Sequence, residues 1–269
     1  MKLAFIGMND LPNLEIDACF ARDHDFPGLE FNWWGDFSAV TADTVKAMRG
    51  VLDDHGVRCS GLGLWGWNHL SPDAAERATA HEMLNRGIDF AKIIGAEVLI
   101  TGGGQIPGAG ISENANEFLK VFPPLLDRIQ EAGLKPAFYA VHGASFFTSI
   151  EAYEAVWEKL PQVGIKYDPA NWRHANLDYL DVVRRHGDKV TYVHIKEHLY
   201  YKGELVSQPA AGMGDIEWGK VMAFLYEADY HGYLSMEPHG DIWGWGPRAG
   251  EMRTKMLLLS QKYLGQFML

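Results

Sequence analysis

The sequence predicts a single (β/α)₈ barrel, the TIM barrel fold, with residues 1–269 forming one domain. Three observations predict it. Eight short apolar segments alternate with helical patterns, the length of 269 residues fits one barrel, and no Pro/Ser-rich linker divides the chain. Parallel strands need helical crossovers, so the alternation indicates a parallel sheet. An open doubly wound sheet would alternate in the same way with fewer units, and the count of eight favours the closed barrel.

The strand candidates are short and mostly apolar. They are Leu3–Gly7, Gly28–Asn32, Cys59–Trp65, Glu97–Gly102, Pro136–His142, Val163–Asp168, Val190–Ile195 and Tyr233–Glu237. Between most of them lie amphipathic segments that begin at polar N-caps and end at glycines, as helices do. These helix candidates are Thr41–Gly56, Asp73–Gly95, Ser112–Gly133, Ser149–Leu160, Leu177–Gly187, Glu217–Gly232 and a last one within Arg248–Leu264.

Composition excludes several classes of function. The net charge of −11 argues against nucleic acid or an anionic membrane as a partner, because both favour basic patches. No apolar run approaches the roughly 18 residues that span a bilayer, and the N-terminus is typical of a first strand rather than a signal peptide. Two cysteines, Cys19 and Cys59, are too few for a disulfide framework and indicate a reduced, cytoplasmic protein.

Polar residues gather where the predicted strands end, which is where a barrel of this kind places its chemistry. Asp168, His194 and Glu237 come from strands six, seven and eight. Two carboxylates and one imidazole form a mixed O/N set that suits a divalent ion, Mn²⁺ foremost, with Mg²⁺, Co²⁺ and Zn²⁺ as alternatives. Such a set leaves positions open for a substrate.

Four segments carry a family resemblance: VGIKYDPANW, VTYVHIKEH, GMGDIEW and YLSMEPH. The chain resembles the sugar-phosphate-isomerase/epimerase superfamily of xylose-isomerase-like barrels, near its ketose 3-epimerase, hydroxypyruvate isomerase and inosose dehydratase members. The resemblance covers essentially the whole chain. It implies a divalent metal held by a strand-five Glu together with Asp168, His194 and Glu237. It also implies that Lys196 lies at the site and that the GMGDIEW loop covers it.

Two positions depart from the family pattern. Ala140 stands where the family carries the strand-five Glu, and Asn171 stands where ketose epimerases carry a His. In the ketose 3-epimerases that Glu and the strand-eight Glu are paired acid/base groups, and one such group is worth roughly 10² to 10⁴ in rate. Three explanations stay open: His142 is the fourth ligand, the chemistry needs one carboxylate, or Ala140 is an introduced change. Strand alternation predicts that Ala140 and Lys196 face the site and that Tyr139 and Glu197 face away.

Tryptophans indicate the substrate class. Seven of the nine lie in or beside the predicted catalytic-end loops: Trp33, Trp34, Trp65, Trp67, Trp172, Trp243 and Trp245. Flat apolar rings with one N–H donor suit sugars, and the scarcity of basic residues there argues against a phosphorylated substrate. The residues expected to contact substrate are Glu30, Trp33, Trp65, Trp67, His142, Asn171, Trp172 and His239.

The sequence therefore predicts a divalent-metal-dependent isomerase or epimerase of a non-phosphorylated keto sugar or related polyol. The reaction would pass through a metal-stabilised enediolate, with Glu237 or the group lost at position 140 moving the proton. One alternative is a metal-dependent lyase that carries out dehydration or 3-keto-glycoside elimination. The other is a barrel that binds a sugar without turnover. Relatives are often dimers or tetramers, so a homo-oligomer is compatible with the chain.

Overall fold

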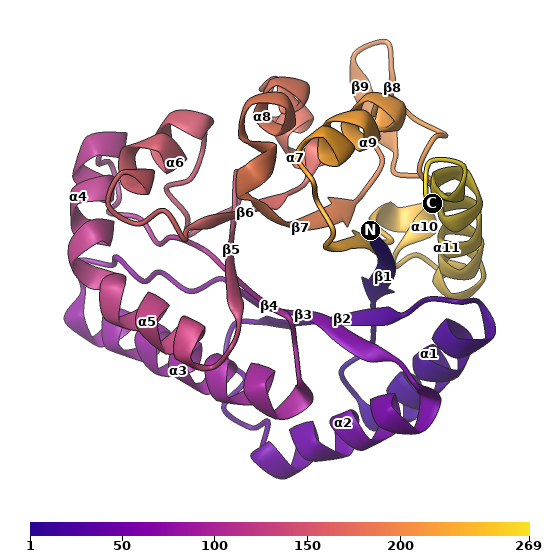
Figure 1. Cartoon of the computed structure of the whole chain (residues 1–269), viewed down its shortest axis with the longest axis horizontal. Coiled ribbons are helices and arrows are strands. Elements are labelled where there is room, and N and C mark those ends of the chain that lie inside the picture. The colour runs from indigo at the N-terminus through magenta and orange to yellow at the C-terminus, as the bar shows by residue number, and fades with distance from the viewer.

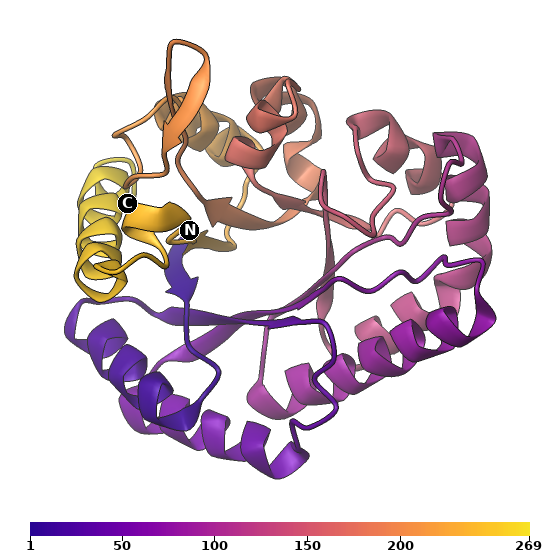
Figure 2. The ribbon, with the colours of Figure 1, turned by 180° about the vertical axis from the view of Figure 1, so that it is seen from behind.

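Eight parallel strands close into the predicted barrel, and helices surround it (Figures 1 and 2). The computed structural model describes residues 1–269. Around the barrel the order is β1-β10-β7-β6-β5-β4-β3-β2, so chain neighbours pair throughout. The strands are β1 (Lys2–Ile6), β2 (Gly28–Trp34), β3 (Arg58–Trp65), β4 (Val98–Thr101), β5 (Lys135–Tyr139), β6 (Gly164–Tyr167), β7 (Val190–Ile195) and β10 (Tyr233–Met236).

The helices confirm every predicted helical segment. Ser112–Gly133 is two helices rather than one, because two prolines follow Phe122 and break the hydrogen-bond ladder. None of the helices has the length and apolar character to cross a membrane. The helices are α1 (Leu11–Asp23), α2 (Ala42–His55), α3 (Ala74–Ile94), α4 (Ile111–Val121), α5 (Pro123–Glu131), α6 (Ile150–Trp157), α7 (Pro169–His174), α8 (Tyr179–His186), α9 (Trp218–Glu227), α10 (Gly240–Trp243), α11 (Ala249–Gly265) and the short 3₁₀ helix η1 (Gly187–Lys189).

Besides the short helices α7 and α10, the predicted pattern lacks three elements: helix α1 and the two strands of a hairpin. Helix α1 lacks a clean apolar stripe because its inner face carries Asp17, whose buried carboxylate pairs with Arg253 at 2.7 Å. An antiparallel hairpin of β8 (Leu199–Tyr201) and β9 (Glu204–Ser207) follows β7 and projects beyond the ring of helices (Figure 1). Its turn places Lys202 and Gly203 at positive φ, the backbone conformation that two-residue hairpin loops require.

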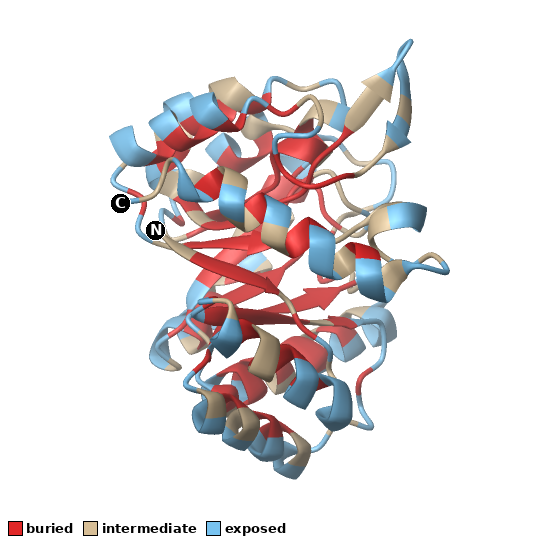
Figure 3. Ribbon diagram, turned by 90° about the vertical axis from the view of Figure 1, so that its right-hand side faces the viewer, coloured by how far each residue is buried: buried red, intermediate tan, exposed pale blue.

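Strand alternation divides the core into two layers. Inward side chains form a small cluster inside the barrel, and outward side chains join a cluster of 64 residues between barrel and helices. Figure 3 shows this second layer, where buried helix faces meet buried strands. The inner cluster consists of Ala4, Trp65, Val98, Ile100, Ala137, Tyr139, Tyr192 and Tyr233.

Candidate active site

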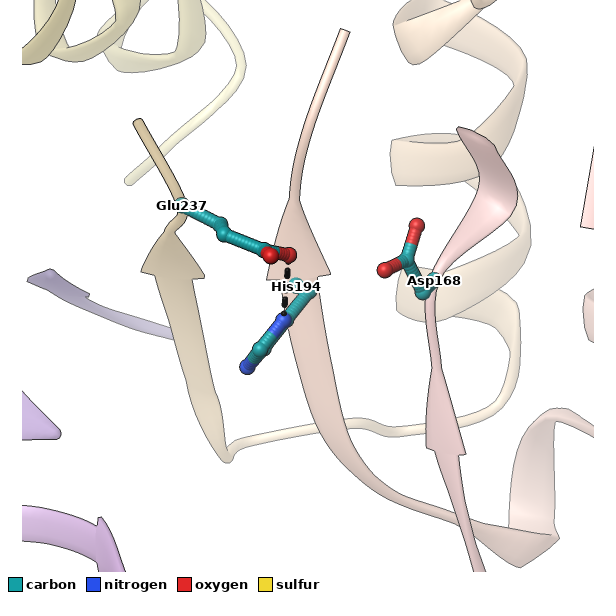
Figure 4. Close-up of side chains that lie close together, drawn as sticks. All are labelled: Asp168, His194 and Glu237. Carbon is teal, nitrogen blue, oxygen red and sulfur yellow. Dashed lines mark hydrogen bonds and ion pairs between the residues drawn. The ribbon is translucent and has the colours of Figure 1, made fainter. Parts of the chain in front are cut away.

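The structure brings Asp168, His194 and Glu237 together at the carboxyl ends of β6, β7 and β10 (Figure 4). Asp168 follows β6 and caps the N-terminus of α7, His194 lies within β7, and Glu237 follows β10. One ligand atom from each lies within 4.8 Å of the others. This is a carboxylate–imidazole cluster of the kind that can hold a divalent ion.

His194 is held between two carboxylates. Its Nδ1 lies 2.9 Å from Glu237 Oε2, and its Nε2 lies 2.9 Å from both oxygens of Glu30. Ionised carboxylates only accept hydrogen bonds, so this arrangement favours a ring that donates from both nitrogens, the imidazolium form. Burial alone would lower the pKa of His194, but the charge of Glu30 together with the hydrogen bonds to Glu237 and Glu30 raises the pKa above its usual value.

Glu30 is a positioning residue rather than a substrate contact. It is completely buried, and it accepts hydrogen bonds from Ser235 at 2.6 Å and Asn32 at 2.8 Å besides contacting His194. Its oxygens are therefore fully used inside the protein. The sequence-based expectation that Glu30 touches substrate is replaced by a role in orienting the imidazole.

Two buried lysines neutralise the other carboxylates. Lys166 Nζ lies 3.0 Å from Asp168 Oδ2, and Lys196 Nζ lies 3.2 Å from the same oxygen and 3.3 Å from Glu237 Oε2. Burial alone would raise the pKa of Asp168 and Glu237, but the ammonium groups hold both well below their usual values. Lys196 was expected at the site. Lys166 was missed, although its position two residues before Asp168 puts it on the same side of β6.

The end of β5 differs from the sequence-based expectation. Tyr139 belongs to the inner cluster, whereas Ala140 belongs with Phe138 to the outer core and is 3% exposed. Tyr139 is in register with Lys166, and Ala137 with Gly164. The prediction that Ala140 faces the site and Tyr139 faces away is therefore wrong by one residue. A carboxylate at position 140 would point into the apolar core.

A cavity of about 420 Å³ opens above the cluster. Two tryptophans of its wall, Trp34 and Trp65, stack with ring centroids 5.1 Å apart. Trp65 stacks in turn on the buried Tyr139, with centroids 4.4 Å apart. The ring of His142 meets Trp65 edge-on at 5.3 Å and forms no hydrogen bond. Eleven residues line the cavity: Ile6, Asn32, Trp34, Trp65, His142, Lys166, His194, Glu237, Pro238, His239 and Trp245.

Of the expected substrate contacts, Trp65, His142 and His239 line this cavity. The others do not. Trp33 points outward and stacks on Phe37 at 5.7 Å, since alternation along β2 turns Trp34 inward instead.

Trp172 and Trp67 are likewise not in the cavity wall. Trp172 is 1% exposed in the core, and Trp67 packs edge-on against Phe37. Asn171 donates its backbone N–H to Asp168 Oδ1 at 3.1 Å, so it caps the carboxylate. The physical reason is common to both tryptophans: large aromatic side chains in short loops are also the residues that best fill the space between them.

The GMGDIEW segment does not line the cavity. Glu197 anchors this segment by accepting hydrogen bonds from the backbone N–H groups of Gly212 and Ile216, each at 3.0 Å, and from Trp218 Nε1 at 2.9 Å. Glu197 thus has the structural role that strand alternation predicts for it. The expectation that the GMGDIEW loop covers the site is replaced by an anchored loop beside it.

The donor set tests the expected metal. The three ligand atoms converge as a divalent ion would need, but Lys166 and Lys196 are already paired with the two carboxylates, and both His194 nitrogens face carboxylates. Strand β5 contributes Tyr139 to the barrel interior and no ligand. A divalent ion at this cluster would therefore have to compete with partners that already occupy its ligand atoms.

A barrel with ionised groups and an aromatic cavity at the carboxyl ends of its strands is the arrangement of an enzyme that acts on small polar molecules. The chain belongs to the family of xylose isomerase-like TIM barrels, which it matches over residues 19–262. This confirms the resemblance seen in the sequence. A search of the curated proteins finds no match.

Solved structures share the fold over nearly the whole chain. A xylose isomerase domain protein from Planctomyces limnophilus has a TM-score of 0.77 at 20% identity, covering 98% of this chain and 96% of that one. D-allulose 3-epimerase from Methylomonas sp., in complex with D-allulose, has a TM-score of 0.76 at 17% identity, covering 99% and 96%. The IolI protein with a bound zinc atom has a TM-score of 0.72 at 14% identity, covering 98% and 99%.

Proposed function

We propose that this protein is a sugar isomerase or epimerase that removes and returns a proton on the carbon next to the carbonyl of a non-phosphorylated keto sugar or related polyol. One observation carries the proposal: a carboxylate, an ammonium and a free imidazole, from Glu237, Lys166 and His142, face one cavity with an aromatic wall. The family and the epimerases among its structural neighbours support the same reaction class.

Glu237 is the candidate base because it is the one carboxylate in the cavity lining. Its Oε2 is held by His194 at 2.9 Å and Lys196 at 3.3 Å. Its Oε1 makes no hydrogen bond, and the imidazole Nε2 of His239 lies 3.8 Å away from it. One oxygen thus fixes the carboxylate while the other is available to a substrate proton.

His142 is suited to be the second proton-transfer group. Strands β5 and β10 lie three places apart in the eight-membered ring, so His142 and Glu237 approach the cavity from nearly opposite sides. Burial, followed by the charges of Lys166 and Lys196, lowers the pKa of His142 to about 4, which leaves the imidazole neutral near pH 7. In epimerisation, Glu237 takes the proton from one face, and His142, after taking up a proton from solvent, delivers that proton to the opposite face. Glu237 then releases its own proton to solvent. Return of a proton to the neighbouring carbon gives isomerisation.

The cavity wall supports a sugar as substrate. Trp34 and Trp65 present flat rings to the C–H face of a sugar, and Asn32 and His239 offer polar groups to its hydroxyls. Lys166 is the only lysine in the lining and no arginine accompanies it. A phosphate group would normally meet an arginine cluster, so the substrate we propose carries none.

Solvent-exchange measurements test the proposal. Keto sugars are incubated with the enzyme in D₂O, and NMR follows deuterium at the carbon next to the carbonyl. We expect exchange by the wild type and a loss of roughly 10² to 10⁴ in Glu237→Gln, which removes the base. Glu204→Gln, on the exposed hairpin, is the matched control.

Other outcomes select the alternatives. A new unsaturated product identifies the lyase. The single carboxylate in the cavity lining favours this alternative, because elimination can proceed with one base. Sugar binding without exchange at any carbon contradicts the proposal and identifies a sugar-binding barrel.

A further inference from the structure

The two buried lysines lie where the sequence predicts a metal ion. We propose that Lys166 and Lys196 take the place of a divalent cation at Asp168 and Glu237, so that the site works without a metal. Lys166 then supplies the positive charge to the substrate oxygen. This inference deepens the proposed function. Its activity measurement rests on that function, whereas its metal titrations do not.

Both oxygens of the Asp168 carboxylate already have partners within the protein. Its Oδ2 lies 3.0 Å from Lys166 Nζ and 3.2 Å from Lys196 Nζ, and its Oδ1 accepts the backbone N–H of Asn171 at 3.1 Å. Lys196 continues to Glu237 Oε2 at 3.3 Å. The side chains of Lys166 and Lys196 are only 2% and 4% exposed. A metal at Asp168 would have to displace Lys166, whose ammonium group pairs with no other carboxylate.

The charges of the site already balance. Three carboxylates, from Glu30, Asp168 and Glu237, face three cations, from Lys166, Lys196 and the His194 imidazolium. Buried charges are stable only when they are paired. A dication bound in place of the His194 proton would leave one unpaired positive charge in the protein interior, because β5 brings in no further carboxylate.

The two lysines divide the work. Lys166 lines the cavity, and an ammonium has three hydrogens, of which Asp168 uses one. The remaining hydrogens can donate to the carbonyl oxygen of a substrate and to the enediolate that forms from it. Lys196 does not line the cavity and joins Asp168 to Glu237, which makes it a positioning residue.

Metal binding by the wild-type protein is the decisive test. The protein is dialysed against EDTA, its metal content is measured by mass spectrometry, and Co²⁺ and Mn²⁺ are titrated by visible absorption and calorimetry. We expect no stoichiometric metal and no saturable binding at concentrations below about 1 mM. A stoichiometric metal that survives dialysis, or saturable binding at micromolar concentration, overturns the proposal.

Removing one ammonium should create a metal site. Lys166→Met keeps the length of the side chain and removes its charge, and Lys202→Met on the exposed hairpin turn is the matched control. We expect Co²⁺ to bind Lys166→Met at least about tenfold more tightly than the wild type, with the control unchanged. Circular dichroism shows whether Lys166→Met folds. If Lys166→Met does not fold, Lys196→Met is used in its place. Equal affinity in folded variant and wild type counts against the proposal, and the wild-type titration decides alone if neither variant folds.

Activity gives an independent arm. Exchange of the substrate proton that is unaffected by EDTA and by added Mn²⁺ supports the lysine pair, and exchange that requires a metal overturns it. If no keto sugar exchanges under either condition, the proposed function fails, whereas the metal titrations still decide the role of the lysines.

Discussion

Substituting Ala140 with Glu separates the two faces of β5. The family pattern suggests that this change restores a site carboxylate, whereas the structure places residue 140 in the outer core, where Ala140 is 3% exposed. A carboxyl group in apolar surroundings has a pKa near 8 to 9, against about 4.3 in the unfolded chain. Holding it protonated at pH 7 costs about 4 kcal/mol, and the added bulk costs about 1–3 kcal/mol more. The sum is a large part of a typical stability of about 5–15 kcal/mol.

Urea unfolding at two pH values measures this effect. A raised pKa in the folded state means that stability is lost as pH rises above the unfolded pKa, so Ala140→Glu should be much less stable at pH 7 than at pH 4.5, relative to the wild type. Ala140→Gln has similar bulk without the charge and should show the same deficit at both pH values. Tyr139→Glu instead puts a carboxylate on the inner face, in register with Lys166. The assignment of the two faces is refuted if Ala140→Glu is as stable as Ala140→Gln at pH 7.

Three further predictions use other buried groups. Glu30→Gln removes the charge that faces His194 Nε2 and should cost about 3–5 kcal/mol in the free energy of unfolding, while Glu204→Gln should leave it unchanged. Glu197→Gln turns an amide N–H₂ toward N–H donors, so it should lower the free energy of unfolding by about 1–3 kcal/mol. Proteolysis within residues 208–217 should become faster, and equal proteolysis rates in variant and wild type would contradict this anchoring role. Burial lowers the pKa of His69 to about 3, so the fold favours neutral His69 and stability falls as pH drops below about 6.5. Between pH 7.5 and pH 5 the loss should be about 2 kcal/mol, and His69→Gln should lack that component in urea titrations at the two pH values.

The elements that could be predicted are those set by local pattern. All eight barrel strands were found from apolar runs, and Asp168, His194 and Glu237 were placed together because parallel strands end at the same edge of a barrel. The hairpin β8–β9 was not predicted, since its strands are only three and four residues long and half exposed.

The errors within the site have one physical origin. Along a strand, a shift of one residue reverses the face of a side chain, and sequence alone does not fix where alternation continues past the end of a strand. Position 140 was assigned inward in place of Tyr139, and Trp33 was assigned to the cavity in place of Trp34. Lys166 follows from the same alternation, because it lies two residues before Asp168 and pairs with it at 3.0 Å.

The aromatic residues inside the barrel have a consequence for traffic through the enzyme. Tyr139, Tyr192 and Tyr233 are at most 2% exposed and fill the barrel interior beside the cavity-lining Trp65. Packed side chains fill the barrel, as in other barrels of this kind, so it is a core and not a pore. Under the proposed function, a sugar therefore enters and leaves at the carboxyl ends of the strands, the end where Glu237 lies.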